Sequence, residues 1–173
     1  MGQRIAITGK PGCGKTTLCR RLAREVEGLA GGLLTEEIRE KGRRVGFKLE
    51  DLSTGEQGLL SHVDKCSGPS VGRYSVCLVQ LRSIGVSAIE RALEEKELLI
   101  VDEIGPMELK SDSFVDTIRK ALRWNGDLLF TIHRRSNHPL LREIRDDFQV
   151  EVLNRDNREE VFQKVIAVLG DRE

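Results

Sequence analysis

The sequence predicts an α/β fold in which a mostly parallel central sheet is flanked by helices and extended by additional antiparallel strands. Short apolar segments alternate with segments of helical periodicity along most of the 173 residues, the pattern typical of parallel sheets with crossover helices. Between positions 31 and 80, strand-like segments are separated by short turns, which predicts hairpins. The length suits one domain with a substantial core, so we expect a single domain over 1–173.

The first predicted unit is a strand, a glycine-rich loop and a helix. Residues 4–8 read RIAIT, a short apolar strand directly before the loop. Leu18, Leu22 and Val26 then recur at helical spacing with arginines between them. Gly28 is suited to ending this helix, because glycine tolerates the backbone geometry of a helix terminus.

Residues 31–80 have the pattern of antiparallel strands. Strands are predicted at 32–35 and 45–49 with a turn at 41–42, and a turn at 53–56 precedes a further strand at 73–81. We expect these segments to add a hairpin to the parallel sheet.

The rest of the chain returns to alternating helices and strands. An amphipathic helix at 83–96 leads into an apolar strand at 98–102. The elements predicted after it are a helix at 113–124, a strand at 128–132, a helix from about Pro139, a strand at 148–153 and a helix at 158–169. For the last helix, Asn157 with Glu160 forms a predicted capping pair and Gly170 a stop.

Composition and charge argue against several classes of protein. Lys and Arg total 28 and Asp and Glu total 28, so no net charge draws the chain toward nucleic acid or anionic lipid. No apolar run reaches the roughly 20 residues of a membrane span, and the N-terminus lacks a signal-peptide pattern, so we expect a cytoplasmic protein. A basic cluster is interpreted as a solvated hairpin face rather than a nucleic-acid arm; it comprises Arg39, Lys41, Arg43 and Arg44.

The four cysteines are expected to be reduced thiols, because they show no CxxC pair and no secreted context. They are Cys13, Cys19, Cys66 and Cys77. His62 with Cys66 could form half of a zinc site, but no second ligand pair lies at suitable spacing. A zinc site is therefore disfavoured.

The glycine-rich loop matches the phosphate-binding motif GxxxxGK[ST] without a mismatch. Its glycines let backbone N–H groups curl around phosphate oxygens, where a Cβ would obstruct. Lys15 brings positive charge to the β and γ phosphates, the Thr16 hydroxyl is suited to ligate Mg²⁺, and the helix N-terminus adds its dipole. The strand before the loop and the helix after it argue against a glycine turn without a ligand. The predicted nucleotide-binding residues are Gly9, Lys10, Pro11, Gly12, Cys13, Gly14, Lys15, Thr16 and Thr17.

Two adjacent carboxylates follow the apolar run 98–101. In a parallel sheet this run ends at the same edge as the phosphate loop. We expect Asp102 to hold Mg²⁺, through a water, with Thr16 supplying a direct oxygen. Glu103 is not needed for the metal and could polarise a water for attack on the γ phosphate. The alternatives are an Asp that caps a loop and a Glu that faces solvent.

The next apolar strand ends in Thr131-Ile132-His133. A polar side chain from this neighbouring strand could reach the γ phosphate or the attacking water, although a residue at a strand end often has only a loop role. Thr131 and His133 are therefore candidate sensors of the γ phosphate.

Several segments together resemble the small thermophile-type P-loop nucleoside triphosphatases, whose human member is called cancer-related nucleoside triphosphatase. They are the phosphate loop, DEIGPMEL from Asp102, GLLTEEIR from Gly32, VGF from Val45, VGRY from Val71 and NRDNR from Asn154. The resemblance covers nearly the whole chain. The segment Thr131-Ile132-His133-Arg134 also resembles a family segment, but His133 departs from it because the family often has proline at this position.

The resemblance implies a RecA-like fold and Mg²⁺-dependent release of phosphate from ATP, GTP and other nucleoside triphosphates, with relaxed base preference. It implies that Glu103 is the general base, acting beside the catalytic Lys15. It also implies a second nucleotide-binding segment, made of Leu98, Leu99, Ile100, Val101, Asp102, Glu103, Ile104 and Gly105.

Phosphoryl transfer usually needs an arginine to neutralise charge, and the sequence offers two sources. One is the hairpin region with Arg39 and Arg43 or Arg44, and the other is Arg134 with Arg135. We expect one of them to reach the γ phosphate, from the same chain or from a neighbouring subunit.

Two other functions stay open on the residues alone. A nucleotide or small-molecule kinase shares the phosphate loop, but such an enzyme must exclude water, which disfavours a carboxylate at Glu103. A nucleotide-gated binding module is the second, although residues 154–157 lack the Lys and final Asp of a GTPase-type NKxD motif. No protein partner can be named from the sequence.

Overall fold

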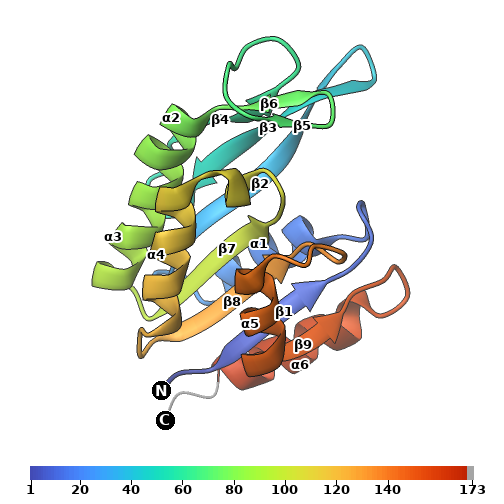
Figure 1. Cartoon of the computed structure of the whole chain (residues 1–173). Helices are drawn as coiled ribbons and strands as arrows, with labels where there is room; N and C mark the ends of the chain where they lie inside the picture. The colour runs from blue at the N-terminus through green and yellow to red at the C-terminus, as the bar shows by residue number, and fades with distance from the viewer. Residues whose placement is uncertain (171–173) are drawn as a thin grey trace.

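The computed structural model describes residues 1–170, which form one mixed sheet with helices on both faces (Figure 1). Within these residues the sheet has nine strands in the order β5-β6-β4-β3-β2-β7-β8-β1-β9. The strands are β1 (Arg4–Thr8), β2 (Ala30–Glu40), β3 (Arg43–Asp51), β4 (Gln57–His62), β5 (Ser70–Val71), β6 (Tyr74–Val76), β7 (Leu98–Ile104), β8 (Asp127–Ile132) and β9 (Gln149–Val152). The helical elements are α1 (Lys15–Glu25), α2 (Leu78–Gln80), η1 (Leu81–Val86), α3 (Ser87–Glu95), η2 (Glu108–Lys110), α4 (Asp112–Leu122), α5 (Pro139–Asp147) and α6 (Arg158–Gly170).

The sheet has a parallel half and an antiparallel half. Strands β2, β7, β8, β1 and β9 pair in parallel, whereas β3, β4, β6 and β5 pair antiparallel beyond β2. β2 belongs to both halves: 30–33 pair with β7, and 33–40 pair with β3. The predicted α/β architecture with an added hairpin is confirmed. Because the parallel strands share one direction, their carboxyl ends lie along a single edge of the sheet.

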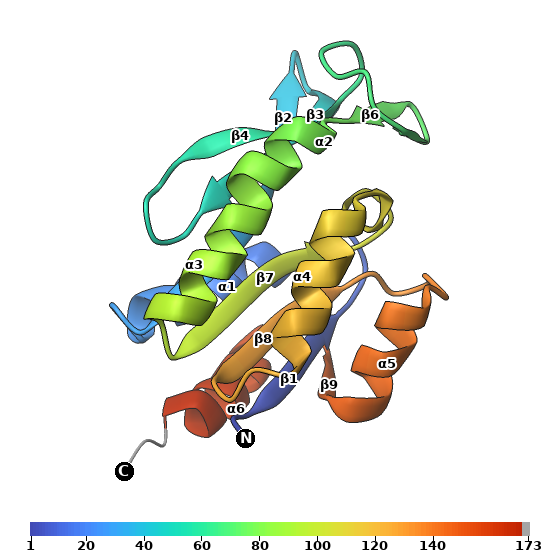
Figure 2. The same cartoon turned by 60° about the vertical axis from the view of Figure 1, so that its left-hand side comes forward.

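Residues of the sheet alternate between two buried clusters. Ile5 and Ile7 pack with α1 and α6 on one face, whereas Ala6 between them packs with η1, α3, α4 and α5 on the other. In β7, Leu98 and Ile100 face the first cluster, and Leu99 and Val101 face the second. Figure 2 shows α3 and α4 side by side over the second face. This near-continuous burial explains why β7 reads as an unbroken apolar run. In the part of the chain that the structure describes, no helix has the length and apolarity that a membrane crossing requires.

The boundary between β6 and the following helix differs from the prediction. The strand predicted at 73–81 ends at Val76, and the helix begins at Leu78 rather than at Ser83. Leu81 and Ile84 are buried against the sheet, so the apolar run after Val76 supplies the first buried turns of a helix. A short apolar run does not distinguish a strand from a buried helix by its periodicity.

The start of α6 also differs from the prediction. The Asn157 side chain bonds backward, its Oδ1 accepting from Asn154 N at 2.8 Å and its Nδ2 donating to Val152 O at 2.8 Å. It closes the turn before α6 instead of pairing with Glu160.

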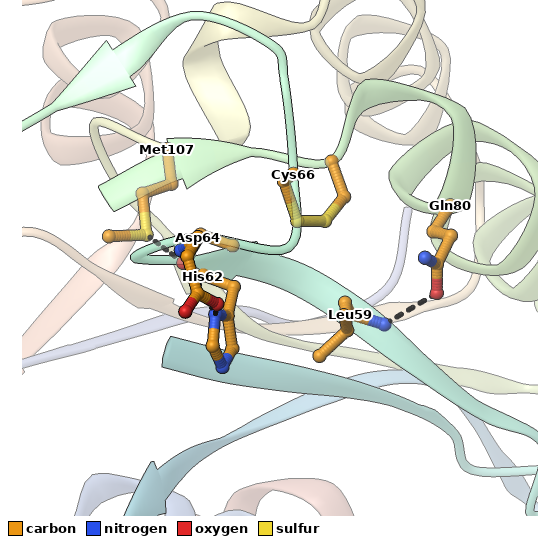
Figure 3. Close-up of a disulfide and its surroundings, with 8 residues drawn as sticks. Leu59, His62, Asp64, Cys66, Gln80 and Met107 are labelled. Atoms are coloured by element: carbon orange, nitrogen blue, oxygen red, sulfur yellow. Dashed lines mark hydrogen bonds and ion pairs between the residues drawn. A yellow bond between two sulfur atoms is a disulfide. The ribbon is translucent and has the colours of Figure 1, made fainter. Parts of the chain in front are cut away.

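Two of the cysteines form a disulfide, which corrects the prediction of four reduced thiols. Cys66 and Cys77 are bonded, with their Cα atoms 5.1 Å apart, while Cys13 and Cys19 are free and buried (Figure 3). The β5–β6 hairpin folds the chain back so that these two residues meet, a proximity that their spacing did not reveal. Beside the disulfide, His62 Nδ1 lies 2.8 Å from Asp64 Oδ1. Gln80 Oε1 accepts from Leu59 N at 2.7 Å, which ties α2 to β4.

Candidate active site

The phosphate loop joins β1 to α1 at the carboxyl edge of the sheet. Gly12 and Gly14 adopt φ angles of 77° and 107°, a region that disfavours any side chain with a Cβ. A Cβ on Gly9 would lie 2.5 Å from the Leu153 carbonyl oxygen, so the close packing of β1 on the end of β9 also requires glycine there. Lys15 Nζ donates to Gly9 O at 2.7 Å across the loop. The loop therefore has the backbone geometry expected of a phosphate-binding loop.

Asp102 lies directly beside this loop at the end of the buried part of β7. It is only 2% exposed, and both carboxylate oxygens accept hydrogen bonds. Thr16 Oγ1 donates to Oδ2 at 2.7 Å, and Thr131 Oγ1 donates to Oδ1 at 2.6 Å. Burial raises the pKa of Asp102 to about 6, although these two hydrogen bonds oppose the shift. The pairing of Asp102 with Thr16 brings together the two residues that the sequence assigned to the metal.

The donor set around Asp102 fits Mg²⁺. Thr16 and Asp102 present hydroxyl and carboxylate oxygens, the hard ligands that this ion prefers. Within residues 1–170, Asp102 has no Lys or Arg in an ion pair, and no three His, Cys, Asp or Glu side chains converge on a metal position. Mg²⁺ commonly takes one or two protein ligands and completes its shell with phosphate oxygens and water. The arrangement suits such an ion better than zinc.

Glu103 is the half-buried carboxylate that follows Asp102. Burial raises its pKa, and the nearby positive charge of Lys15 works in the opposite direction. Glu103 therefore lies close enough to the phosphate loop for its charge to interact with the motif lysine. This position is the one that the sequence predicted for a residue that activates water.

Glu108 is a third carboxyl group of the site, and no role was predicted for it from the sequence. It lies in the short turn η2, is 4% exposed, and its Oε2 accepts from Gly105 N at 3.1 Å. Burial raises the pKa of Glu108 to about 8, and the charge of Glu103 adds to the shift. The signal that could have revealed it is its place between two apolar residues, Met107 and Leu109, directly after the strand that carries the site.

Three side chains surround the backbone of Gly105. A Cβ built on this glycine would lie 3.5 Å from Glu108 Oε2, 3.6 Å from Glu103 Cδ and 3.5 Å from His133 Cβ. The turn after β7 therefore holds both glutamates and His133 around one point. Met107 anchors the turn from the other side, since Ser61 Oγ of β4 lies 3.2 Å from its sulfur.

The candidate sensors Thr131 and His133 lie at the end of β8 and make contacts within the protein. Thr131 contacts Asp102 and so supports the carboxylate rather than extending into the space above the loop. His133 Nδ1 accepts from the backbone N–H groups of Arg135 and Ser136, both at 3.2 Å. Burial lowers the pKa of His133, and the charge of Lys15 lowers it further. His133 is thus a turn-forming residue whose neutral form is favoured by burial and by the charge of Lys15.

The candidate arginines fall into two groups. Arg39 and Arg44 both pair with Glu37, at 2.9 and 3.1 Å, and Arg44 Nε also donates to Tyr74 Oη at 2.9 Å. The guanidinium groups of these two hairpin arginines are therefore already paired within the hairpin region. Arg134 and Arg135 are exposed in the turn after β8, which Arg145 fixes by donating to His133 O at 2.8 Å. The second group remains the better source of an arginine within this chain.

Comparison with known proteins shows the family to which the chain belongs. A family model described as NTPase matches residues 4–166. The chain belongs to this NTPase family. It is 43% identical over 166 residues to the nucleoside-triphosphatase THEP1 of Methanosarcina acetivorans, covering 94% of each chain. It is 44% identical over 168 residues to THEP1 of Thermotoga maritima, covering 96% of this chain and 95% of that protein.

Two solved NTPase structures share the fold over nearly the whole chain. The crystal structure of THEP1 from Aquifex aeolicus superposes with a TM-score of 0.89 at 32% identity, covering 98% of this chain and 100% of that one. The solution structure of a human cancer-related nucleoside triphosphatase gives a TM-score of 0.79 at 32% identity, covering 99% and 100%. The predicted family resemblance is confirmed, and the protein is an NTPase-family enzyme.

Proposed function

We propose that this NTPase hydrolyses nucleoside 5′-triphosphates, ATP and GTP among them, to diphosphate and phosphate in a Mg²⁺-dependent reaction with Glu103 as the general base. The observation that supports the proposal is that the two adjacent carboxylates at the end of β7 have different contacts. Asp102 is engaged by Thr16 and Thr131, whereas Glu103 interacts with the charge of Lys15 and has no such hydroxyl partners among the described residues. Glu103 is therefore the carboxylate left to act on water.

Each residue has a task that follows from its position. The phosphate loop binds the β and γ phosphates through its backbone N–H groups, and Lys15 would exchange its contact with Gly9 O for a phosphate oxygen. Thr16 and Asp102 would hold Mg²⁺, which when bound neutralises charge on the β and γ phosphates. Thr131 keeps the Asp102 carboxylate oriented.

Glu103 would take one proton from the attacking water. The water oxygen then bonds to the γ phosphorus while the bond from that phosphorus to the β–γ bridging oxygen breaks, leaving nucleoside diphosphate and phosphate. A base works best when its pKa lies near the operating pH. The raised pKa of Glu103 is in the direction that favours this role.

Phosphate release from a panel of nucleoside triphosphates, with and without Mg²⁺, tests this proposal. Glu103→Gln should leave nucleotide affinity nearly unchanged and lower turnover by roughly 100-fold or more. Turnover close to that of the unmodified protein would show that Glu103 is not the base. Free phosphate produced without an added acceptor distinguishes hydrolysis from a kinase reaction, which would require the acceptor.

A further inference from the structure

The order of strands sets the direction in which a nucleotide can lie across the site. Asp102, Glu103 and Thr131 come from β7 and β8, which lie on one side of β1 (Figure 1). β9 pairs with β1 on the opposite side, with Leu153 N donating to Thr8 O at 2.8 Å. If the γ phosphate faces β7 and β8, as the proposed function requires, the nucleoside must extend toward the segment between β9 and α6.

Arg158 is the first residue of α6 and lies against the outer side of the phosphate loop. Its Nε donates to Cys13 O at 2.7 Å, and a Cβ on Gly14 would lie 2.9 Å from that same nitrogen. The side chain is exposed, and within residues 1–170 it has no carboxylate in an ion pair and no acceptor for its Nη groups. The structure therefore holds an uncompensated guanidinium in a fixed position beside the loop.

The neighbouring carboxylate does not neutralise Arg158. Glu159 forms a two-point ion pair with Arg21, at 2.6 and 3.1 Å. This hydrogen-bonded pair lowers the pKa of Glu159 to about 2. The charge of the exposed Arg158 side chain therefore stays available to a ligand.

The side-chain amides of Asn154 and Asn157 close the turn before Arg158. Asn154 Oδ1 accepts from Asp156 N and Asn157 N, at 2.9 and 3.0 Å. Asn157 bonds to Asn154 N and Val152 O. The oxygens of both amides are engaged within the turn, so neither asparagine can offer an oxygen and a nitrogen together to the edge of a base.

We propose that the segment 154–158 forms the nucleoside subsite, and that the Arg158 guanidinium packs against the face of the nucleobase. This inference rests on the proposed function only for the orientation of the triphosphate. Guanidinium groups stack on π systems, and every base presents such a face, so the contact binds purines of either kind without discriminating between them. A cation over an aromatic ring contributes about 0.5–2 kcal/mol, which corresponds to a change in affinity of roughly 2- to 30-fold.

Equilibrium binding of three Mg²⁺-containing probes tests the subsite: ADP, GDP and inorganic pyrophosphate. Pyrophosphate fills the phosphate loop but has no nucleoside. For Arg158→Ala we expect about 10-fold weaker binding of ADP and GDP and unchanged binding of pyrophosphate. Arg158→Lys keeps the charge but loses the flat face, so it should also weaken ADP and GDP. Arg142→Ala, an exposed arginine on α5, is the matched control and should change none of the three affinities.

Three outcomes would overturn the inference. Equal losses for pyrophosphate and ADP would show that Arg158 only supports the loop, and full ADP affinity in Arg158→Lys would show that charge, not stacking, is responsible. Unchanged ADP binding in a folded Arg158→Ala variant would remove Arg158 from the site altogether. These measurements need no turnover, so a selective loss of ADP and GDP binding would support the subsite even if Glu103→Gln hydrolysed ATP normally.

Discussion

Replacing Glu108 by Gln should change how the stability of the protein depends on pH. Glu108 has an ordinary pKa of 4.5 and a folded-state pKa of about 8, because it is buried beside Glu103. The folded state thus holds a proton that the unfolded state releases above pH 4.5. The stabilisation is fully present below that pH and is lost as pH rises toward 8. Gln keeps an oxygen for Gly105 N but cannot ionise.

The size of the effect follows from proton linkage. One proton bound only by the folded state gives a slope of about 1.4 kcal/mol of unfolding free energy per pH unit. Between pH 6.5 and 7.5 Asp102, with its pKa of about 6, is largely ionised in both proteins, so the difference in slope comes from Glu108 and the neighbouring Glu103 carboxyl. Because Glu108 begins to ionise in the folded state near pH 7.5, we expect the unmodified protein to lose about 1.2 kcal/mol more than Glu108→Gln over this unit.

Urea unfolding at closely spaced pH values, without Mg²⁺ or nucleotide, measures both slopes. Glu94→Gln, an exposed site on α3, is the control and should follow the unmodified protein. Parallel slopes for the unmodified protein and Glu108→Gln would refute the description of Glu108 as a buried, proton-holding carboxyl group.

Three further substitutions have expected outcomes. Thr131→Val removes a donor to Asp102 and should raise the Mg²⁺ concentration for half-maximal phosphate release about 10-fold, with little change in unfolding temperature; an unchanged Mg²⁺ dependence would contradict this role. An alanine at Gly14 would be strained by the φ of 107° and its Cβ would clash with the Arg158 guanidinium, whereas an alanine at Gly12 would meet only the strain of a φ of 77°. Gly14→Ala should therefore weaken ADP binding, measured by calorimetry, more than Gly12→Ala does. Equal effects of the two substitutions would count against the Arg158 contact. Phe114→Ala empties a fully buried site on α4 and should lower the free energy of unfolding by about 3–5 kcal/mol, measured in urea; a loss below 1 kcal/mol would be inconsistent with that packing.

The parts of the fold that the sequence predicted are those in which periodicity and burial agree. β7 is buried on both faces and reads as a continuous apolar run, and α1 shows its buried side in Leu18 and Leu22. The helix that begins at Leu78 was assigned in part to a strand, because its first apolar residues follow β6 without a turn signal. Long-range contacts such as Cys66–Cys77 depend on how the β5–β6 hairpin folds back, which local sequence does not encode.

The candidate site was predictable where a motif fixes chemistry and geometry together. The loop from Gly9 to Thr16 and the adjacent Asp102 are brought together as expected. Glu108 was missed because a charged residue in a loop normally faces solvent, and its burial depends on the turn that brings it back to Gly105. Arg158 was missed because its contact with Cys13 joins residues 145 positions apart.

Single-turnover phosphate release by Glu103→Gln tests the central claim most directly. At saturating ATP and Mg²⁺, we expect the rate of Glu103→Gln to be lower than that of the unmodified protein by roughly 100-fold or more, with ADP affinity within about 2-fold. A rate within a factor of three of the unmodified protein, with ATP bound, would contradict the assignment of Glu103 as the base.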